Sequence, residues 1–292
     1  MRGRFFPTWG IFALTACGGE AAENARATAW DAEIAVDAAL GTDGATGVPD
    51  AAPDPDAMPP APASVGVTGN AFNFASQGGS LIGGVVSVLE RPGVTATTTD
   101  DGAFAFDVLP VGAELTFVLS YMDYPPIQTG THVLPPDGMA RVSFQAPDPD
   151  LYDTLARVVR VIPAPDRCQI ATTVTRVGNS LYDDTPGTHG EPDATVTIDP
   201  TPPDVDGPVY FNLVKYNVIW PDRQLRATTA DGGVLFLNVP EGEYTLRASK
   251  PDTTFRPVKI KCRAGFLANA SPPWGLQALT GGVGPRTEPD WQ

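Results

Sequence analysis

The clearest feature of the chain is an alternation of apolar and polar positions that occurs twice, each time directly after an Asp-Gly pair. The two copies are residues 97–112, TTTDDGAFAFDVLPVG, and residues 227–242, ATTADGGVLFLNVPEG. A period of two predicts a half-buried β-strand. Asp-Gly favours a type I′ hairpin turn, in which both central residues have positive φ. The chain is therefore predicted to be a duplicated β module, with turns at residues 101–102 and 231–232.

The alternation also predicts the core of the first copy. Phe104, Phe106 and Val108 share one face of their strand, and the two phenylalanines are expected to point inward. The next inward row is Leu115, Phe117, Leu119 and Tyr121. Further strands are predicted at residues 65–69, 81–89, 127–134 and 140–145.

The second copy follows a similar plan with a longer segment before its hairpin. Residues 244–248 match residues 115–119 once one residue is skipped after the glycine, and residues 209–220 predict one long apolar strand. Between the copies, residues 151–159 place leucines and valines at helical spacing behind two aspartates, which predicts a short linking helix. Other strands are predicted at residues 168–174, 194–198 and 258–262.

Composition agrees with an all-β chain and restricts its partners. The 30 Gly and 31 Pro among 292 residues indicate many turns and little long helix. The net charge of −15 argues against a basic face for nucleic acid or for an anionic membrane surface.

The first residues are predicted to be an export signal. Arg2 and Arg4 precede an apolar run, residues 5–16, which is too short to span a bilayer. The run ends in Leu-Thr-Ala-Cys, which resembles the lipobox of bacterial lipoproteins. That resemblance implies cleavage before Cys17 and lipid, including palmitate, on its thiol. An ordinary secretory signal with an incidental cysteine is the alternative. Gly18, where an Asp would resemble an inner-membrane retention signal, favours the outer membrane.

Composition shifts predict the boundaries of the domains. Residues 18–63 are rich in Ala, Pro, Asp and Glu, which is typical of a disordered tether. A weak partner-docking helix at residues 27–40 is the minority alternative there. The expected segments are a signal peptide at 1–16, a lipid-anchored tether at 17–63, a first β-sandwich at 64–146, a linker at 147–165, a second β-sandwich at 166–280 and a flexible tail at 281–292.

A disulfide is predicted within the second copy. Cys168 and Cys262 both point toward the core side of their strands, near its first and last strand. With Cys17 assigned to lipid, they are the two thiols left in an exported chain, so a bridge is the simplest pairing. Two separate buried thiols are the alternative.

The repeated hairpin carries a family likeness. Residues 98–112 read Thr-Thr-x-Asp-Gly-x-Phe-x-Phe-x-x-Leu-Pro-x-Gly, which is similar to the carboxypeptidase regulatory-like domain. The resemblance implies two tandem transthyretin-like or Ig-like β-sandwiches, so the expected fold class is all-β, after a signal peptide and a disordered acidic tether. Because the motif is structural, it implies a fold and no activity. The second copy matches at Thr228, Thr229, Asp231, Gly232, Phe236, Pro240, Gly242 and Tyr244, with Val234 in place of the first phenylalanine.

Candidate chemistry is confined to one loop. Residues 183–193 contain carboxylates and a histidine, which can hold a divalent cation. The spacing of these residues fits no EF-hand, and a solvated loop is the usual meaning of such a charge cluster. The chain has only His132 and His189, in different copies, and no catalytic residue or cofactor is predicted. The weak metal candidates are Asp183, Asp184, His189, Glu191 and Asp193.

These features predict a lipid-anchored cell-envelope protein whose β modules serve a binding or structural role and which is not an enzyme. The expected partners are the membrane, through Cys17, and an envelope protein or a glycan, with no nucleic acid. One alternative is an enzyme or metal-dependent protein with its site in residues 183–193 or in the cleft between the domains. Another is a carbohydrate binder that uses exposed aromatics such as Tyr121, Tyr124 or Trp274.

Overall fold

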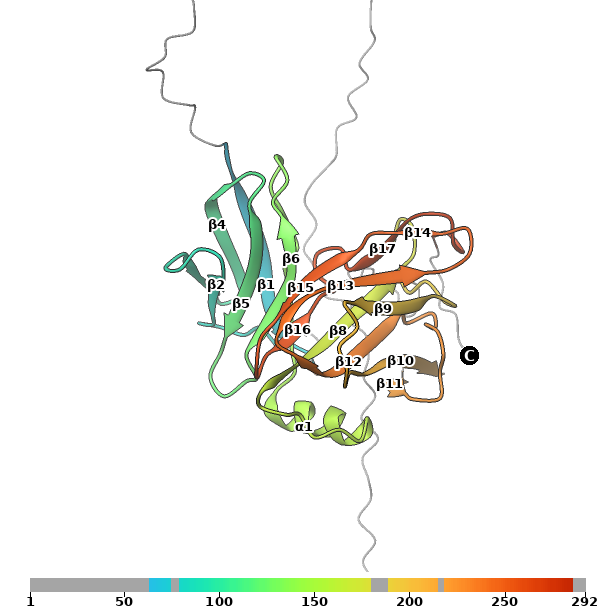
Figure 1. Ribbon diagram of the computed structural model, residues 1–292. Helices are drawn as coiled ribbons and strands as arrows, with labels where there is room; N and C mark the ends of the chain where they lie inside the picture. The colour runs from blue at the N-terminus through green and yellow to red at the C-terminus, as the bar shows by residue number, and fades with distance from the viewer. Residues whose placement is uncertain (1–62, 75–78, 180–188, 215–217, 286–292) are drawn as a thin grey trace, which may run out of the picture. The chain divides into compact units, whose positions relative to one another are not determined.

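The computed structural model describes residues 63–74, 79–179, 189–214 and 218–285, and in these ranges the chain is mostly β with one short helix (Figure 1). The segments predicted to be a signal peptide and a tether before Ala63 lie outside the described residues, as do Cys17, Asp183, Asp184 and the end of the predicted tail. The elements are β1 (Ser64–Asn73), β2 (Val85–Val88), β3 (Thr95–Thr97), β4 (Ala103–Pro110), β5 (Glu114–Ser120), β6 (Ile127–Val133), β7 (Phe144–Ala146), α1 (Pro149–Val158), β8 (Arg167–Thr175), β9 (Thr195–Asp199), β10 (Asp206–Val214), β11 (Val218–Asp222), β12 (Gly233–Pro240), β13 (Gly242–Ser249), β14 (Thr254–Phe255), β15 (Val258–Cys262), β16 (Leu267–Asn269) and β17 (Leu276–Thr280).

The first half of the described chain forms two layers of strands around one hydrophobic core. Strands β4, β1 and β7 are neighbours in one sheet, and β3, β2, β5 and β6 are neighbours in the other. The predicted inward residues 104, 106, 115, 117 and 119 all belong to this core, while Tyr121 is only partly buried against it. Period-two alternation thus identified the main core rows of this half.

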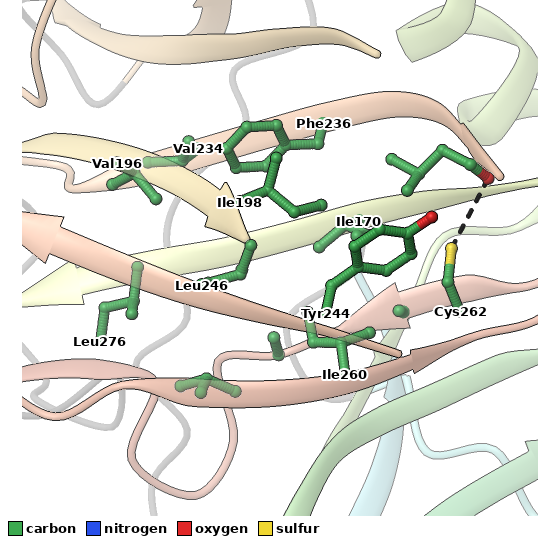
Figure 2. Packing of buried hydrophobic residues seen from close by; sticks show 14 of the residues in the cluster. Ile170, Val196, Ile198, Val234, Phe236, Tyr244, Leu246, Ile260, Cys262 and Leu276 are labelled. Carbon is green, nitrogen blue, oxygen red and sulfur yellow. Dashed lines mark hydrogen bonds between the residues drawn. The ribbon is translucent and has the colours of Figure 1, made fainter. Parts of the chain in front are cut away.

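The second half repeats the two-layer plan around a separate core. Strands β11, β10, β12, β8 and β16 follow one another in one layer, and β15, β13 and β9 form the other. Strand β9 illustrates the alternation that builds this core, because it buries Val196 and Ile198 and exposes the residues on either side of each. Figure 2 shows Phe236, Ile198 and Leu246, from three different strands, packed in this core.

The structure contains the predicted disulfide between Cys168 on β8 and Cys262 on β15, with 5.8 Å between their Cα atoms. Both cysteines are buried in the second core. The bridge does not join the first strand to the last, because β16 and β17 follow β15 along the chain. A disulfide of this kind is typical of an exported protein.

The prediction that Val108 shares one strand face with Phe104 and Phe106 is wrong. Val108 is 71% exposed and Leu109 is completely buried. The reason is a β-bulge: the three residues of β1 from Val65 to Val67 face the four residues of β4 from Phe106 to Leu109. The extra residue reverses the alternation. An equivalent bulge occurs in β12 between residues 236 and 239, opposite β8.

The prediction of type I′ turns is also wrong. Only the glycines have positive φ, 78° at Gly102 and 79° at Gly232, and each donates its N–H to the carbonyl of the threonine three residues earlier. This is a type I turn that ends in a left-handed glycine, the arrangement of a three-residue hairpin. Each aspartate instead accepts the N–H two residues ahead, at 3.2 Å for Asp101 and 3.0 Å for Asp231. That hydrogen bond stabilises the aspartate in an ordinary turn conformation.

The single long strand predicted at residues 209–220 is two strands. The chain reverses between Val214 and Val218, so that β10 and β11 pair in antiparallel register from Tyr210 opposite Asp222. A mostly apolar run does not show where a hairpin turns, because its residues are compatible with positions in either strand. This hairpin widens the layer that begins with β12.

Strand β6 belongs to both halves. It pairs with β5 in the first half, and it also pairs in parallel with β16 and at one position with β15 in the second. Side chains support this junction: Gln128 donates to the carbonyl of Lys261 and accepts from Arg263 at 2.9 Å, and Lys259 pairs with Glu114 at 2.9 Å. Because polar β6 has strands on both sides, all of it except Val133 is buried.

The duplication extends to a buried hydrogen-bond network. In the first copy the Thr98 hydroxyl donates to the Leu81 carbonyl and accepts from the Gly84 N–H at 2.8 Å. In the second, Thr228 bonds in the same way to the Glu191 carbonyl at 2.6 Å and to the Ala194 N–H at 2.9 Å. These contacts make residues 80–84 and 190–194 equivalent.

Replacing Thr228 by valine is expected to lower the free energy of unfolding by about 1–3 kcal/mol, because a buried N–H and a buried carbonyl lose their partner. The change conserves shape, so packing should be little affected. Urea denaturation measures it. Thr195→Val, at an exposed threonine in β9, is the control and should change stability by no more than about 0.5 kcal/mol. Equal effects of the two substitutions would contradict the network.

Candidate functional site

The structure does not bring the described metal candidates together. His189 and Glu191 are buried, whereas Asp193 is exposed. Among the described residues, no group of three or more His, Cys, Asp or Glu side chains is placed to hold a metal ion. Asp193 has a φ of 62° and occupies the position that Gly83, with a φ of 77°, has in the first copy. Its place is therefore explained by a left-handed turn, which aspartate tolerates.

Glu191 is held by an internal ion pair. Its side chain is completely buried, and it bonds to the ammonium group of Lys250, whose side chain is 14% exposed. The same carboxylate accepts the N–H of Val283 at 3.0 Å, and Lys250 also donates to the Pro192 carbonyl at 2.9 Å. The equivalent position in the first copy is the core residue Leu81. The ion pair joins this loop to the end of β13 and to the chain after β17.

His189 lies instead beside the second hairpin turn. Its carbonyl accepts the N–H of Arg176 at 2.8 Å, and the next residue, Gly190, donates to the Ala230 carbonyl at 3.0 Å. A Cβ on Gly190 would lie 2.2 Å from that carbonyl oxygen, so only glycine allows the loop to approach the turn this closely. The loop thereby places a buried imidazole next to Asp231.

Asp231 differs sharply from its counterpart Asp101. Burial raises the pKa of Asp231 above its usual 3.8, although the charge of His189 and the N–H of Gly233 oppose that rise. Asp101 is exposed, and hydrogen bonds from the Thr99 hydroxyl and the Ala103 N–H lower its pKa. The same turn therefore carries a solvated carboxylate in one copy and a buried one in the other.

A cavity of about 210 Å³ lies between α1 and the second half of the chain. Its floor is the outward side of β8 and β12, including Ala171 and Leu235. Residues of α1, among them Leu155, form its roof. His189 and Asp231 also line it. The cavity combines a largely apolar wall with one buried ionisable pair.

Helix α1 spans this cavity without packing tightly on the strands. The helix begins after Asp148, whose side chain caps it by accepting the Leu151 N–H at 2.8 Å. Asn73 binds the other oxygen of that carboxylate at 3.2 Å, and Arg223 donates to the carbonyl of Val159 at 2.8 Å. None of the residues in the helix is buried. Its two ends are therefore tethered while its apolar side faces the cavity.

The other histidine lies at the junction of the two halves. His132 on β6 is buried, its ring centre is 5.6 Å from that of Trp274, and Arg256 stacks 4.7 Å from the same indole. Burial lowers the pKa of His132 from 6.5 to about 4; the Pro272 carbonyl opposes this and the charge of Arg256 adds to it. The imidazole is therefore neutral near pH 7. Its Nε2 has no hydrogen-bond partner among the described residues.

Stability is expected to depend on His132 between pH 6.5 and about 4. The unfolded chain binds a proton in that window and the folded chain does not, so stability present above pH 6.5 is lost as the pH falls, by up to about 3 kcal/mol. Carboxylates contribute their own slope, so the measure is the difference between wild type and His132→Gln in urea denaturation. Parallel pH profiles of the two proteins would show that His132 does not titrate in this way.

The aromatic residues considered for glycan binding mainly pack inside the molecule. The rings of Tyr121 and Tyr124 meet edge to face at 5.2 Å, and the Tyr124 hydroxyl accepts from Asn73 at 2.8 Å. Trp274 packs against the first core. Trp220 on β11, which the sequence did not single out, is 49% exposed. Among the described residues, no helix has the length and apolar character needed to cross a membrane.

No protein-family model and no curated protein matches the chain. The resemblance to the carboxypeptidase regulatory-like domain therefore rests on the hairpin motif alone. Solved structures similar to the chain include the Bacillus anthracis TIE protein, at 13% identity and a TM-score of 0.24, covering 72% of this chain and 34% of that one. The Streptococcal ancillary pilin has 12% identity and a TM-score of 0.20, covering 72% of this chain and 63% of its own. GBS52, the minor pilin of Streptococcus agalactiae, has 10% identity and a TM-score of 0.22, covering 76% and 100%.

The described residues form a mostly-β chain with one short helix. The candidate site in this chain is the cavity beneath α1 that His189 and Asp231 line. Sequence reasoning had singled out His189 but had explained Asp231 as a turn residue.

Proposed function

We propose that this chain is an exported, lipid-anchored protein of the bacterial cell envelope whose two β-sandwiches act as one rigid binding or structural unit. The observation that carries the proposal is strand β6, which hydrogen-bonds to strands of both halves. Lys261 adds an ion pair to Glu90 at 2.7 Å across the same junction. Although burial opposes it, the hydrogen bonds from Lys261 and Thr116 lower the pKa of Glu90. A unit built in this way transmits position and force without bending between its halves.

Three sequence features and one disulfide support the proposed location of the protein in the cell. The lipobox-like segment ends at Cys17, and stable anchoring needs about two acyl chains, which a lipidated N-terminal cysteine supplies. The acidic, proline-rich residues 18–63 are of a composition suited to a spacer between the membrane and the folded unit. The buried disulfide between Cys168 and Cys262 is consistent with export. Gly18 supports placement in the outer membrane, with the partner an envelope protein or a glycan.

The test follows acylation and exposure in cells. Wild-type protein should incorporate labelled palmitate, partition with membranes and have an acylated N-terminal Cys17 by mass spectrometry, whereas Cys17→Ala should be released. Protease shaving of intact cells then separates a surface-facing unit from a periplasmic one. Photo-crosslinking from exposed positions such as Trp220 identifies a protein partner, and a glycan array tests for a glycan partner. An unmodified, freely soluble wild-type chain would overturn the proposal.

A metal-dependent or enzymatic role is the second candidate, because His189 and the buried Asp231 line a cavity. Elemental analysis before and after treatment with chelator tests it. Retained stoichiometric metal that is lost in His189→Gln would favour this role over the structural one. The same metal content in wild type and variant would assign the metal to another place.

A further inference from the structure

We infer that the cavity beneath α1 is a binding site for a small apolar molecule that carries an amine head, with Asp231 as the acceptor for that head. The pocket is lined by α1, by strands of the second half and by Phe74 and Gln145 of the first, and its proposed role does not depend on acylation of Cys17. Three observations carry it: the cavity is built rather than incidental, its walls are apolar, and its one anionic group is buried at the wall.

The first observation is the way in which α1 is held. A helix that only covers a sheet buries its apolar stripe against the strands. Here Leu155 and Tyr152 are only partly buried, and the space between them and the strands is the cavity. Hydrogen bonds at residues 148 and 159 fix the two ends of the helix above that space. The geometry maintains a gap that close packing would otherwise remove.

The second observation is the size and chemistry of the walls. A cavity of about 210 Å³ has room for a molecule of roughly ten to fifteen non-hydrogen atoms, if about 15 Å³ is allowed for each. Leu155, Ala171, Leu235 and Leu267 line it from the helix and from three strands. Apolar lining with few convergent polar groups is the usual character of a small-molecule site.

The third observation is the charge inside. Among the described residues that line the cavity, the ionisable side chains are Tyr152, His189 and Asp231, and none is a lysine or arginine. Asp231 is 8% exposed and accepts one N–H, from Gly233 at 3.0 Å, so its carboxylate has remaining acceptor capacity. Burial leaves the charge of Asp231 poorly solvated, which raises the pKa of its carboxyl. A bound ammonium group would add a counter-charge beside this carboxylate, whereas a carboxylate head would be repelled.

Octylamine, octanol and octanoate are suitable probes, because they share one chain and differ in their heads. Titration calorimetry on the full chain with Cys17→Ala, purified without detergent, should show one site that binds octylamine about tenfold or more tightly than octanol. Octanoate should bind more weakly than octanol. Octylamine that binds no better than octanoate, or no binding of any probe, would overturn the inference.

Substitutions locate the binding. Asp231→Asn should lower octylamine affinity about tenfold and leave octanol affinity unchanged, and Ala171→Phe should abolish binding of both by filling the cavity. Asp101→Asn and Ala105→Phe are the matched controls, since they make the same changes at exposed positions of the first copy. Ala156→Trp fills the cavity from the helix and keeps the test valid if Ala171→Phe fails to fold. Unchanged affinity in Asp231→Asn, or in both cavity-filling variants, would contradict the assignment.

Discussion

Replacing Lys250 by methionine is expected to lower the free energy of unfolding by about 3–5 kcal/mol, because it leaves the carboxylate of Glu191 buried without its cation. Glu191 is completely buried, so water cannot replace the lost partner. The remaining hydrogen bond from the Val283 N–H, at 3.0 Å, does not neutralise the charge. Urea denaturation at pH 7 measures the loss as a shift in midpoint at unchanged slope.

The double variant Glu191→Leu with Lys250→Met separates the two possible causes. A buried ion pair that is replaced as a whole by apolar residues of similar volume is often neutral or stabilising. Leucine also occupies the equivalent core position, Leu81, in the first copy. The double variant should therefore recover most of the stability that the single variant loses. Equal losses in both would show that packing, rather than the unpaired charge, is responsible.

Lys259→Met is the matched control for the lysine. Lys259 pairs with Glu114 at 2.9 Å, but the two side chains are 38% and 44% exposed. Water screens such a pair, and exposed ion pairs contribute at most about 1 kcal/mol. A loss in Lys259→Met as large as that in Lys250→Met would remove burial as the explanation.

Removing the disulfide by Cys168→Ala with Cys262→Ala is expected to cost up to about 5 kcal/mol, the value for closing a loop of on the order of 100 residues. The two cysteines are 94 residues apart in sequence. Their bridge joins β8 in one layer of the second core to β15 in the other. Without the bridge, the unfolded chain gains conformational entropy over most of that half. Denaturation of the two proteins in urea measures the difference.

Wild-type protein treated with reductant is the control and should fall to nearly the stability of the double variant. A titration of free thiols in denatured, unreduced protein should find none besides Cys17, if that thiol is not acylated. Two further free thiols, or a wild-type midpoint that reductant does not change, would contradict a bridge between Cys168 and Cys262.

The duplicated pattern predicted the central parts of the fold for a local reason. Alternation at residues 103–107 and 244–248 places successive side chains on opposite faces, whichever strands lie beside them. Helix α1 likewise followed from the spacing of residues in one segment, whereas the disulfide followed from pairing the two thiols left once Cys17 is assigned to lipid. The predicted skip of one residue after Gly242 makes Leu246 the equivalent of Phe117. The strand pairing agrees, because Leu246 lies opposite Ile198 on β9 as Phe117 lies opposite Val88 on β2.

The errors came from features that alternation does not specify, namely a bulge, the hydrogen bonds of a turn and the division of a run into two strands. The exposure of Val108 follows from a bulge that exists only because β4 pairs with β1. The turns at Gly102 and Gly232 are of type I because the preceding threonine and the aspartate bond to the backbone around the glycine. The division of residues 209–220 into two strands adds a hairpin to the layer. None of these can be read from alternation alone.

By itself, the sequence determined the mostly-β character of the chain, the repeated hairpin with its inward rows, the short helix and the disulfide, because each depends on residue types within one segment or on chemistry that cysteines carry. Only the tertiary structure decided that β6 would be shared, since its polar residues 128–132 are buried through contacts with distant β15 and β16. It also decided that Asp101 is exposed whereas Asp231 is buried. The two turns are alike locally, but a distant loop and helix enclose only the second, and burial depends on what lies around a residue in space.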